Sequence, residues 1–330
     1  MPTTPATTTS ADDLLVRSFR REDREQLTAL VNAHIAAVVP GLSVSVNAVL
    51  SQLEREPGEF IVDRWVATRH ALVAVQRDRL VAATHLVTYR DEPGVSAWAR
   101  GRGELRWLLC WPDAPFWPDA RAAGLALARA AVAVLLDHGC TRIGADGALP
   151  APGVYGIPAQ WPHVADLLTA VGFVPGERQE HVLLADVADL PRTVAPPDVA
   201  LRRTVGANGT RLAAVDPVAA EHATVEVGFV EVELRPTDLG RTSAAGGWAD
   251  VGNLWVAEPA RRRGIARWLL GEAAHWLRLG HVDRLLDYVG PEDQEHLGFA
   301  EALGFERLTT TTRGWERAGG TVPTGATMTW

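Results

Sequence analysis

The sequence contains no lysine, so all 32 of its lysine-plus-arginine residues are arginines. We interpret this bias as the codon usage of a GC-rich genome, without a functional demand behind it. The formal net charge is −8. A net negative charge does not favour binding to a phosphate backbone or to an anionic lipid surface. Nucleic acid and membranes are therefore not expected as partners.

Cysteine is scarce as well, because only Cys110 and Cys140 occur. They lack the CxxC or CxxH spacing of a metal site and do not form a disulfide framework, so we expect no metal and a reducing, cytoplasmic location. No stretch approaches the roughly 18 apolar residues that a transmembrane helix needs. Residues 1–12 have neither a basic start nor an apolar centre, and we predict a disordered tail there, not a signal peptide.

The 330 residues are enough for two ordinary domains, and the order of elements repeats. A helix, a glycine, a short strand, a second helix and a Gly-Phe pair occur in each half, ending at Gly172-Phe173 and at Gly304-Phe305. Such a succession predicts a duplicated unit. Three prolines disfavour regular structure between the copies. We therefore predict a first domain over 13–190, a linker over 191–198, a second domain over 199–318 and a loose tail over 319–330.

Hydrophobic periodicity predicts an α/β (α+β) fold, with a mixed, mostly antiparallel sheet flanked by helices in each half. The predicted helices cover 22–38, 46–56, 122–137, 163–171 and 262–279, with a last one ending at Leu303. The predicted strands cover 14–19, 71–76, 80–88, 104–111, 141–145, 199–203, 211–215, 224–234, 249–256 and 284–288.

Residues 254–270 are the most informative stretch, since a strand runs through a short loop into a helix. The first amides of a helix have no internal partner and lie at the positive end of its dipole, so a diphosphate is a natural ligand there. Gly264 and Ala266 leave room for it. The side chains of Arg261, Arg262 and Arg263 can add charge-assisted contacts. A solvated basic helix start is the alternative interpretation.

This segment resembles the cofactor motif of the GNAT superfamily, the acetyl-CoA-dependent N-acetyltransferases. A strand ending in Val is followed by Pro and by Arg-x-x-Gly-x-Gly/Ala, and a later Phe299–Phe305 stretch resembles the family's second motif. The resemblance implies that the loop amides hold the pyrophosphate of CoA and that the strand edge pairs with the pantetheine arm. The residues that would do so are Leu254, Trp255, Val256, Arg261, Arg262, Arg263, Gly264, Ile265 and Ala266.

Acyl transfer needs a base for the amine and an acid for the leaving thiolate. Asp250 lies six residues before Val256, where many family members carry a carboxylate base that acts through water; a solvent-exposed carboxylate is the alternative. Relatives place a Tyr acid where this chain has Ala300. Tyr288 is the replacement candidate, with a buried core aromatic or a water acid as alternatives.

The N-terminal half repeats the skeleton as Arg121-x-x-Gly124-x-Ala126 and carries Glu104 in the place of Asp250. Its loop over 112–118 is longer and rich in proline and aromatics, so we predict a degenerate half that has lost CoA. The C-terminal half lacks the two helices that follow the first strand. We expect the N-terminal half to supply part of the acceptor wall, in a tandem layout resembling that of mycothiol synthase.

The resemblance thus implies transfer of an acetyl group from acetyl-CoA, as co-substrate, to the amine of an unidentified acceptor. A non-catalytic acyl-CoA-binding or regulatory protein is the alternative. A nucleotide-binding enzyme is disfavoured, because neither GxxxxGK[ST] nor GxGxxG occurs at a strand-to-helix turn. The acceptor, the acyl group and the oligomeric state stay open.

Overall fold

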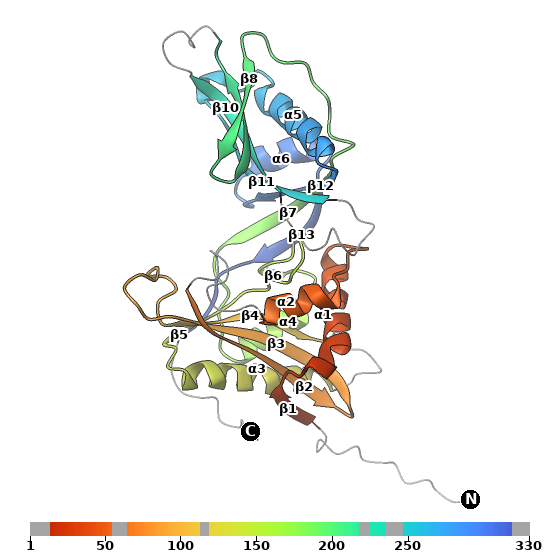
Figure 1. Cartoon of the computed structure of the whole chain (residues 1–330), viewed down its shortest axis with the longest axis vertical. Helices are drawn as coiled ribbons and strands as arrows, with labels where there is room; N and C mark the ends of the chain where they lie inside the picture. The colour runs from red at the N-terminus through yellow and green to blue at the C-terminus, as the bar shows by residue number, and fades with distance from the viewer. Residues whose placement is uncertain (1–13, 55–64, 113–118, 218–224, 235–246, 319–330) are drawn as a thin grey trace, which may run out of the picture.

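The computed structural model describes residues 14–54, 65–112, 119–217, 225–234 and 247–318. Two mixed sheets follow one another along the long axis, each flanked by helices (Figure 1). This arrangement confirms the predicted fold class. Both predicted tails lie outside the described residues.

The N-terminal sheet has the order β1-β2-β3-β4-β5-β14, antiparallel except for the parallel β4–β5 pair. Every residue of β3 from Leu80 to Tyr89 is buried, because helices cover both faces of the sheet. The strands are β1 (Leu14–Ser18), β2 (Val66–Gln76), β3 (Arg79–Tyr89), β4 (Arg102–Cys110), β5 (Arg142–Ala145) and β14 (Trp315–Ala318). The helices are η2 (Arg21–Asp23), α1 (Arg24–Val38), α2 (Val46–Glu54), α3 (Ala120–Asp137) and α4 (Pro162–Ala170).

The C-terminal sheet has the order β6-β13-β7-β12-β11-β10-β9-β8, and α5 packs on its β9–β12 region. A two-residue turn, 207–208, joins β8 to β9, so no helix follows the first strand of this half, as predicted. The strands are β6 (Ile157–Pro158), β7 (Gln179–Asp186), β8 (Ala200–Gly206), β9 (Gly209–Val215), β10 (Glu226–Leu234), β11 (Gly247–Val256), β12 (Val282–Val289) and β13 (Glu306–Thr312). The helices are η6 (Glu258–Ala260), α5 (Ile265–Leu279) and α6 (Gln294–Glu301).

The two sheets exchange strands. β7 precedes the proline-rich segment 191–198, yet it lies between β12 and β13 in the C-terminal sheet. β14 ends the described chain, yet it pairs with β5 in the N-terminal sheet. An isolated bridge between Glu316 of β14 and Val174 adds a contact with the segment that follows α4 in the N-terminal half. Figure 1 shows β7 and β13 in the middle of the molecule, where they connect the two sheets.

The exchange also joins the cores. Val182, Trp248 and Leu286 belong to strands of the C-terminal sheet but are buried in the hydrophobic cluster of the N-terminal half. A second cluster fills the space between α5 and its own sheet. The domain boundary at 191–198 stays a prediction, and strand membership crosses it.

The helix predicted from Arg262 is wrong at its start, because α5 begins at Ile265. Arg262 and Gly264 have φ angles of 61° and 79°, which lie outside the helical region and hold three residues in a loop. Strands β6, β7, β13 and β14 were not predicted.

Candidate active site

Strands β11 and β12 separate beside the loop. They pair in parallel from Gly247 to Asp250, and the pairing ends there although β11 continues to Val256. Gly252 has no partner in the β10–β11 register, which marks a β-bulge. A Cβ on Gly252 would lie 2.6 Å from Cβ of Asn208, so the bulge requires glycine. The separation opens the sheet beyond Asp250.

The loop that follows β11 leads directly into the first turn of α5. Gly264 adopts the left-handed conformation, and a Cβ there would meet no other atom within 4 Å. The first helical bond runs from the Trp268 amide to the Gly264 carbonyl. The amides of Ile265, Ala266 and Arg267 in the first turn are consequently available for an anion, and the helix dipole adds a positive potential there.

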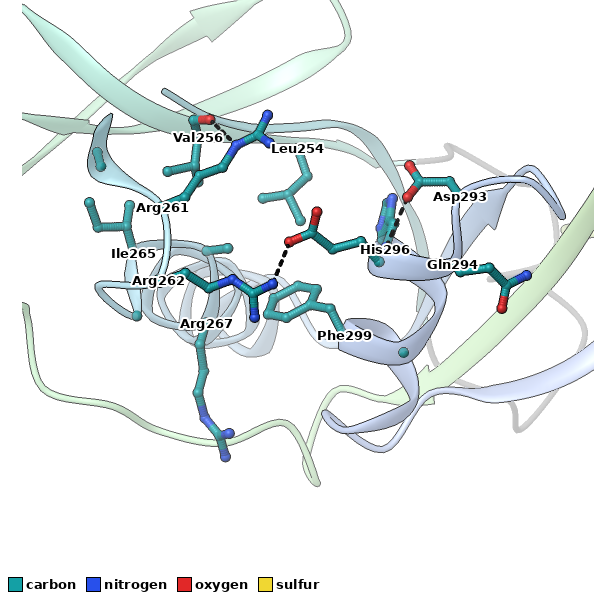
Figure 2. Close-up of a pocket in the computed structure, with 15 residues that line it drawn as sticks. Leu254, Val256, Arg261, Arg262, Ile265, Arg267, Asp293, Gln294, His296 and Phe299 are labelled. Carbon is teal, nitrogen blue, oxygen red and sulfur yellow. Dashed lines mark hydrogen bonds and ion pairs between the residues drawn. The ribbon is translucent and has the colours of Figure 1, made fainter. Parts of the chain in front are cut away.

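A cavity of about 950 Å³ lies between this loop and α6. Figure 2 shows Leu254 and Val256 on one side of it, the start of α5 on a second and α6 on a third. The segment from Asp293 to His296 and the ring of Phe299 form the α6 wall. This volume lies within the range of about 300–1,000 Å³ that is usual for small-molecule and cofactor sites.

Seven of the nine predicted cofactor residues line this cavity. Trp255 does not, because its side chain is on the opposite face of β11, with its ring 5.8 Å from that of Phe229. Arg263 does not either, since its guanidinium donates to the Pro197 carbonyl at 3.4 Å. The seven are Leu254, Val256, Arg261, Arg262, Gly264, Ile265 and Ala266.

The cavity has ion pairs at its rim. Arg262 pairs with Glu295 of α6 at 3.2 Å (Figure 2), but both side chains are largely exposed, so this contact contributes little to stability. His296 donates to Asp287 of β12 at 2.8 Å and is mostly buried. This hydrogen bond raises the pKa of His296 above its usual value.

Because the folded state raises the pKa of His296, the His296–Asp287 pair stabilises the fold fully below the unfolded value of about 6.5. Its contribution is lost as the pH rises through the raised folded pKa. We expect His296→Gln to lower the melting temperature at pH 5.5 and to have a smaller effect at pH 9. Thermal denaturation of both proteins at the two pH values measures this, and an equal loss at both would contradict it.

Asp250 and Tyr288, the two predicted catalytic residues, lie together. Tyr288 donates its hydroxyl to Asp250 Oδ1 at 3.2 Å. Only 3% of Asp250 is exposed, so the alternative of a solvent-exposed carboxylate is wrong. Both side chains are on the sheet face opposite α5, because Ala249 and Val251 pack in the core beneath that helix. The Tyr288 ring also contacts Tyr155 of the N-terminal half, with centroids 5.3 Å apart.

The N-terminal copy of the motif has a different structure. Gly124 lies inside α3, which begins at Ala120, and the Ala123 amide already donates to the Asp119 carbonyl. A Cβ on Gly124 would lie 2.7 Å from Leu167 Cδ1 of α4. The amides that hold a diphosphate in an open loop are thus engaged in a helix, and α4 packs against that helix. Glu104 is buried and accepts the Tyr89 hydroxyl at 2.6 Å.

Sequence reasoning missed a second cavity of about 320 Å³. Its polar wall contains Tyr155, Glu180, Tyr288 and Arg313, which come from four different segments of the chain. No local motif marks these residues, because β6, β7 and β13 bring them together.

No helix in the described parts of the chain is long and apolar enough to cross a membrane.

Comparison with known proteins places the family in the C-terminal half. Residues 203–305 match the acetyltransferase (GNAT) family. No curated protein sequence gives a significant match.

Solved structures match almost the whole chain. One is a tandem GNAT protein from the clavulanic acid biosynthesis pathway, with 16% identity and a TM-score of 0.61, covering 93% of this chain and 99% of its own. Another is a GCN5-related N-acetyltransferase from Sphaerobacter thermophilus, with 15% identity and a TM-score of 0.59, covering 97% and 100%. At these identities the likeness concerns the fold. The chain is therefore a tandem GNAT-fold protein whose matched family domain lies in its C-terminal half.

Proposed function

We propose that the protein is an acetyl-CoA-dependent N-acetyltransferase with one working site, in the C-terminal half. The observation that carries this proposal is the opening of β11 from β12 directly beside the exposed amide start of α5. The cavity there has a volume of about 950 Å³ and is lined by seven of the predicted residues, which supports a site for an elongated anionic ligand. A cytoplasmic location agrees with two buried cysteines that are not joined in a disulfide.

The residues at this cavity fit the parts of CoA. Loop amides and the guanidiniums of Arg261 and Arg262 would hold the diphosphate. The edge of β11 around Leu254 and Val256 is no longer paired with β12, so its backbone groups can pair with the pantetheine arm. Bound acetyl-CoA would supply a thioester as the acyl donor, and strand amides near Val256 would polarise its carbonyl.

Asp250 is the proposed base. Asp250 is buried, its Oδ1 accepts the Tyr288 hydroxyl, and an ionised carboxylate is a group that can take the proton of an amine or a water. Tyr288 orients Asp250 through its 3.2 Å hydrogen bond and is the proposed source of the proton for the leaving thiolate. Ala300, at the usual tyrosine position, is buried and has no titratable group.

The N-terminal half would serve as scaffold and acceptor wall. Its own motif is folded into α3 and packed against Leu167, which supports the predicted loss of CoA binding. Residues 148–155 of this half line the second cavity beside Tyr288, which supports a shared acceptor site.

Acetyl-CoA hydrolysis or transfer by the Gly264→Glu and Gly264→Ala variants tests the donor site. Both variants carry the same backbone strain at a positive φ, but only glutamate places a negative charge at the diphosphate position. We expect Gly264→Glu to raise the acetyl-CoA KM at least about 30-fold, as expected for losing charge-assisted hydrogen bonds. Gly264→Ala should raise it far less. Equal effects of the two variants would contradict the assignment.

The alternative of a non-catalytic acyl-CoA-binding protein predicts tight binding of acetyl-CoA without release of free thiol in the presence of any amine. The position of the Asp250–Tyr288 pair favours the enzyme, because Tyr288 lines the second cavity and so connects the carboxylate to a place where an acceptor can bind.

A further inference from the structure

The second cavity has one apolar and one polar wall. Small residues of the N-terminal half form the apolar wall, and the polar wall is formed by Tyr155, Glu180, Tyr288 and Arg313. A volume of about 320 Å³ is at the low end of the range for small-molecule sites. The apolar wall comprises Ala148, Leu149, Ala151, Gly153 and Val154.

Glu180 is already satisfied by its neighbours. Its Oε1 pairs with Arg178, and its Oε2 accepts the Tyr155 hydroxyl at 2.8 Å and lies 3.6 Å from Arg313 Nη1. Burial raises the pKa of Tyr155, so its hydroxyl remains a donor. One buried carboxylate therefore faces two guanidiniums, and the cluster has an excess positive charge.

Arg313 is the group that can use this excess charge to bind a ligand. Its guanidinium stacks on the Tyr155 ring at 4.7 Å and is 34% exposed. Within the described residues it forms no side-chain hydrogen bond, because its ion pair with Glu180 is too long for one. A guanidinium is a planar set of donors that matches a carboxylate. Arg178 also pairs with Glu180 but does not line the cavity.

Another residue of the polar wall, Tyr288, contacts the proposed base. Tyr288 lines the cavity and donates to Asp250 at 3.2 Å. The cavity thus has a cationic group at Arg313 and a carboxylate just behind Tyr288. A molecule bound in it would lie close to the positive charge of Arg313 and to Tyr288, which is hydrogen-bonded to the proton acceptor Asp250.

We propose that the acceptor is a small amine that also carries a carboxylate, such as an amino acid. Its carboxylate would bind Arg313, and its amine would face the hydrogen-bonded Tyr288–Asp250 pair. This inference rests on the proposed acetyl transfer and names the substrate class for the same site.

In the transfer, the acetyl group moves from sulfur to the amine, and one proton moves from the amine to the thiolate. The neutral amine forms the C–N bond to the acetyl carbon and releases one proton to Asp250. The C–S bond breaks, its electron pair leaves with sulfur, and the thiolate takes a proton from Tyr288, which is restored through Asp250. The products are an N-acetylated carboxylate and free CoA.

Matched acceptors test the class. We would measure thiol release from acetyl-CoA with the twenty L-amino acids, β-alanine and 4-aminobutyrate as acceptors. Each acid is compared with its own carboxamide. Putrescine and spermidine serve as amines without a carboxylate. At least one acid is expected to exceed its carboxamide in kcat/KM by about 10- to 100-fold, the worth of a charge-assisted hydrogen bond. Arg313→Gln should remove that preference by raising KM, with kcat little changed, and Arg313→Lys should restore part of it.

Arg178→Gln is the matched control, because it breaks the same Glu180 network outside the cavity. It should leave the preference intact. An equal loss with Arg178→Gln, a preference for carboxamides or polyamines, or acetyl-CoA binding without acetylation of any compound would overturn the proposal. A wild type that does not bind acetyl-CoA would instead overturn the proposed function itself, which calorimetry distinguishes.

Discussion

Asp250→Asn is expected to lower kcat by about 10²- to 10⁴-fold at saturating acetyl-CoA, which is the usual contribution of a positioned general base. Asparagine keeps the size of the side chain and can still accept the Tyr288 hydroxyl, but it cannot take a proton. The variant should therefore bind acetyl-CoA as the wild type does. Steady-state thiol release together with calorimetric binding measures both quantities.

Glu104→Gln provides the matched control. Glu104 is also a buried carboxylate that accepts a tyrosine hydroxyl, at the corresponding strand of the N-terminal half. Its substitution should change kcat less than about twofold, because that half is the proposed scaffold. Unchanged turnover in Asp250→Asn, or an equal loss in Glu104→Gln, would show that Asp250 is not the base.

Separating the halves at the linker is expected to unfold the C-terminal one. A fragment over 195–330 begins near the exposed Val194 and lacks β7, so β12 and β13 lose the strand between them. Leu183 of β7 and Val187 just after it belong to the core beneath α5, are fully buried and are missing from that fragment, and each contributes about 1.5–3 kcal/mol. The total is about 3–6 kcal/mol, comparable to a whole domain's stability of about 5–15 kcal/mol.

Circular dichroism during heating checks this prediction. Fragment 195–330 should show no cooperative transition, whereas fragment 173–330, which retains β7, should recover one. A full-length chain with a protease cleavage site inserted at Val194 should elute as one particle on gel filtration after it is cut. Each part holds a strand of the other part's sheet. A sharp transition of fragment 195–330 at the temperature of the full chain would contradict the account.

The sequence predicted those features of the fold and the site that depend on residues close together in the chain. The loop from Val256 to Ala266, the two repeated units and the missing helices after β8 could be predicted, because each depends on residues close together in the chain. Asp250 and Tyr288 were each predicted from their strand positions, and the structure brings them within 3.2 Å. Their catalytic role stays a prediction.

Strand exchange could not be predicted in this way. Hydrophobic alternation indicates that a segment is a strand but not which sheet it joins, and β7 pairs with β12 about 100 residues later in the chain. The second cavity depends on that exchange, since Glu180 lies on β7 and Arg313 follows β13. An acceptor wall supplied by the N-terminal half stays a prediction, and the charged residues of the second cavity were not predicted.

The number of acetyl-CoA molecules bound per chain tests the central claim most directly. Calorimetric titration of the full-length wild type should give one site per chain, and Gly264→Glu should abolish it. The N-terminal motif should contribute no second site, because Gly124 is enclosed in α3 beside Leu167. Two sites, no site, or a single site that survives Gly264→Glu would contradict a donor site at the start of α5.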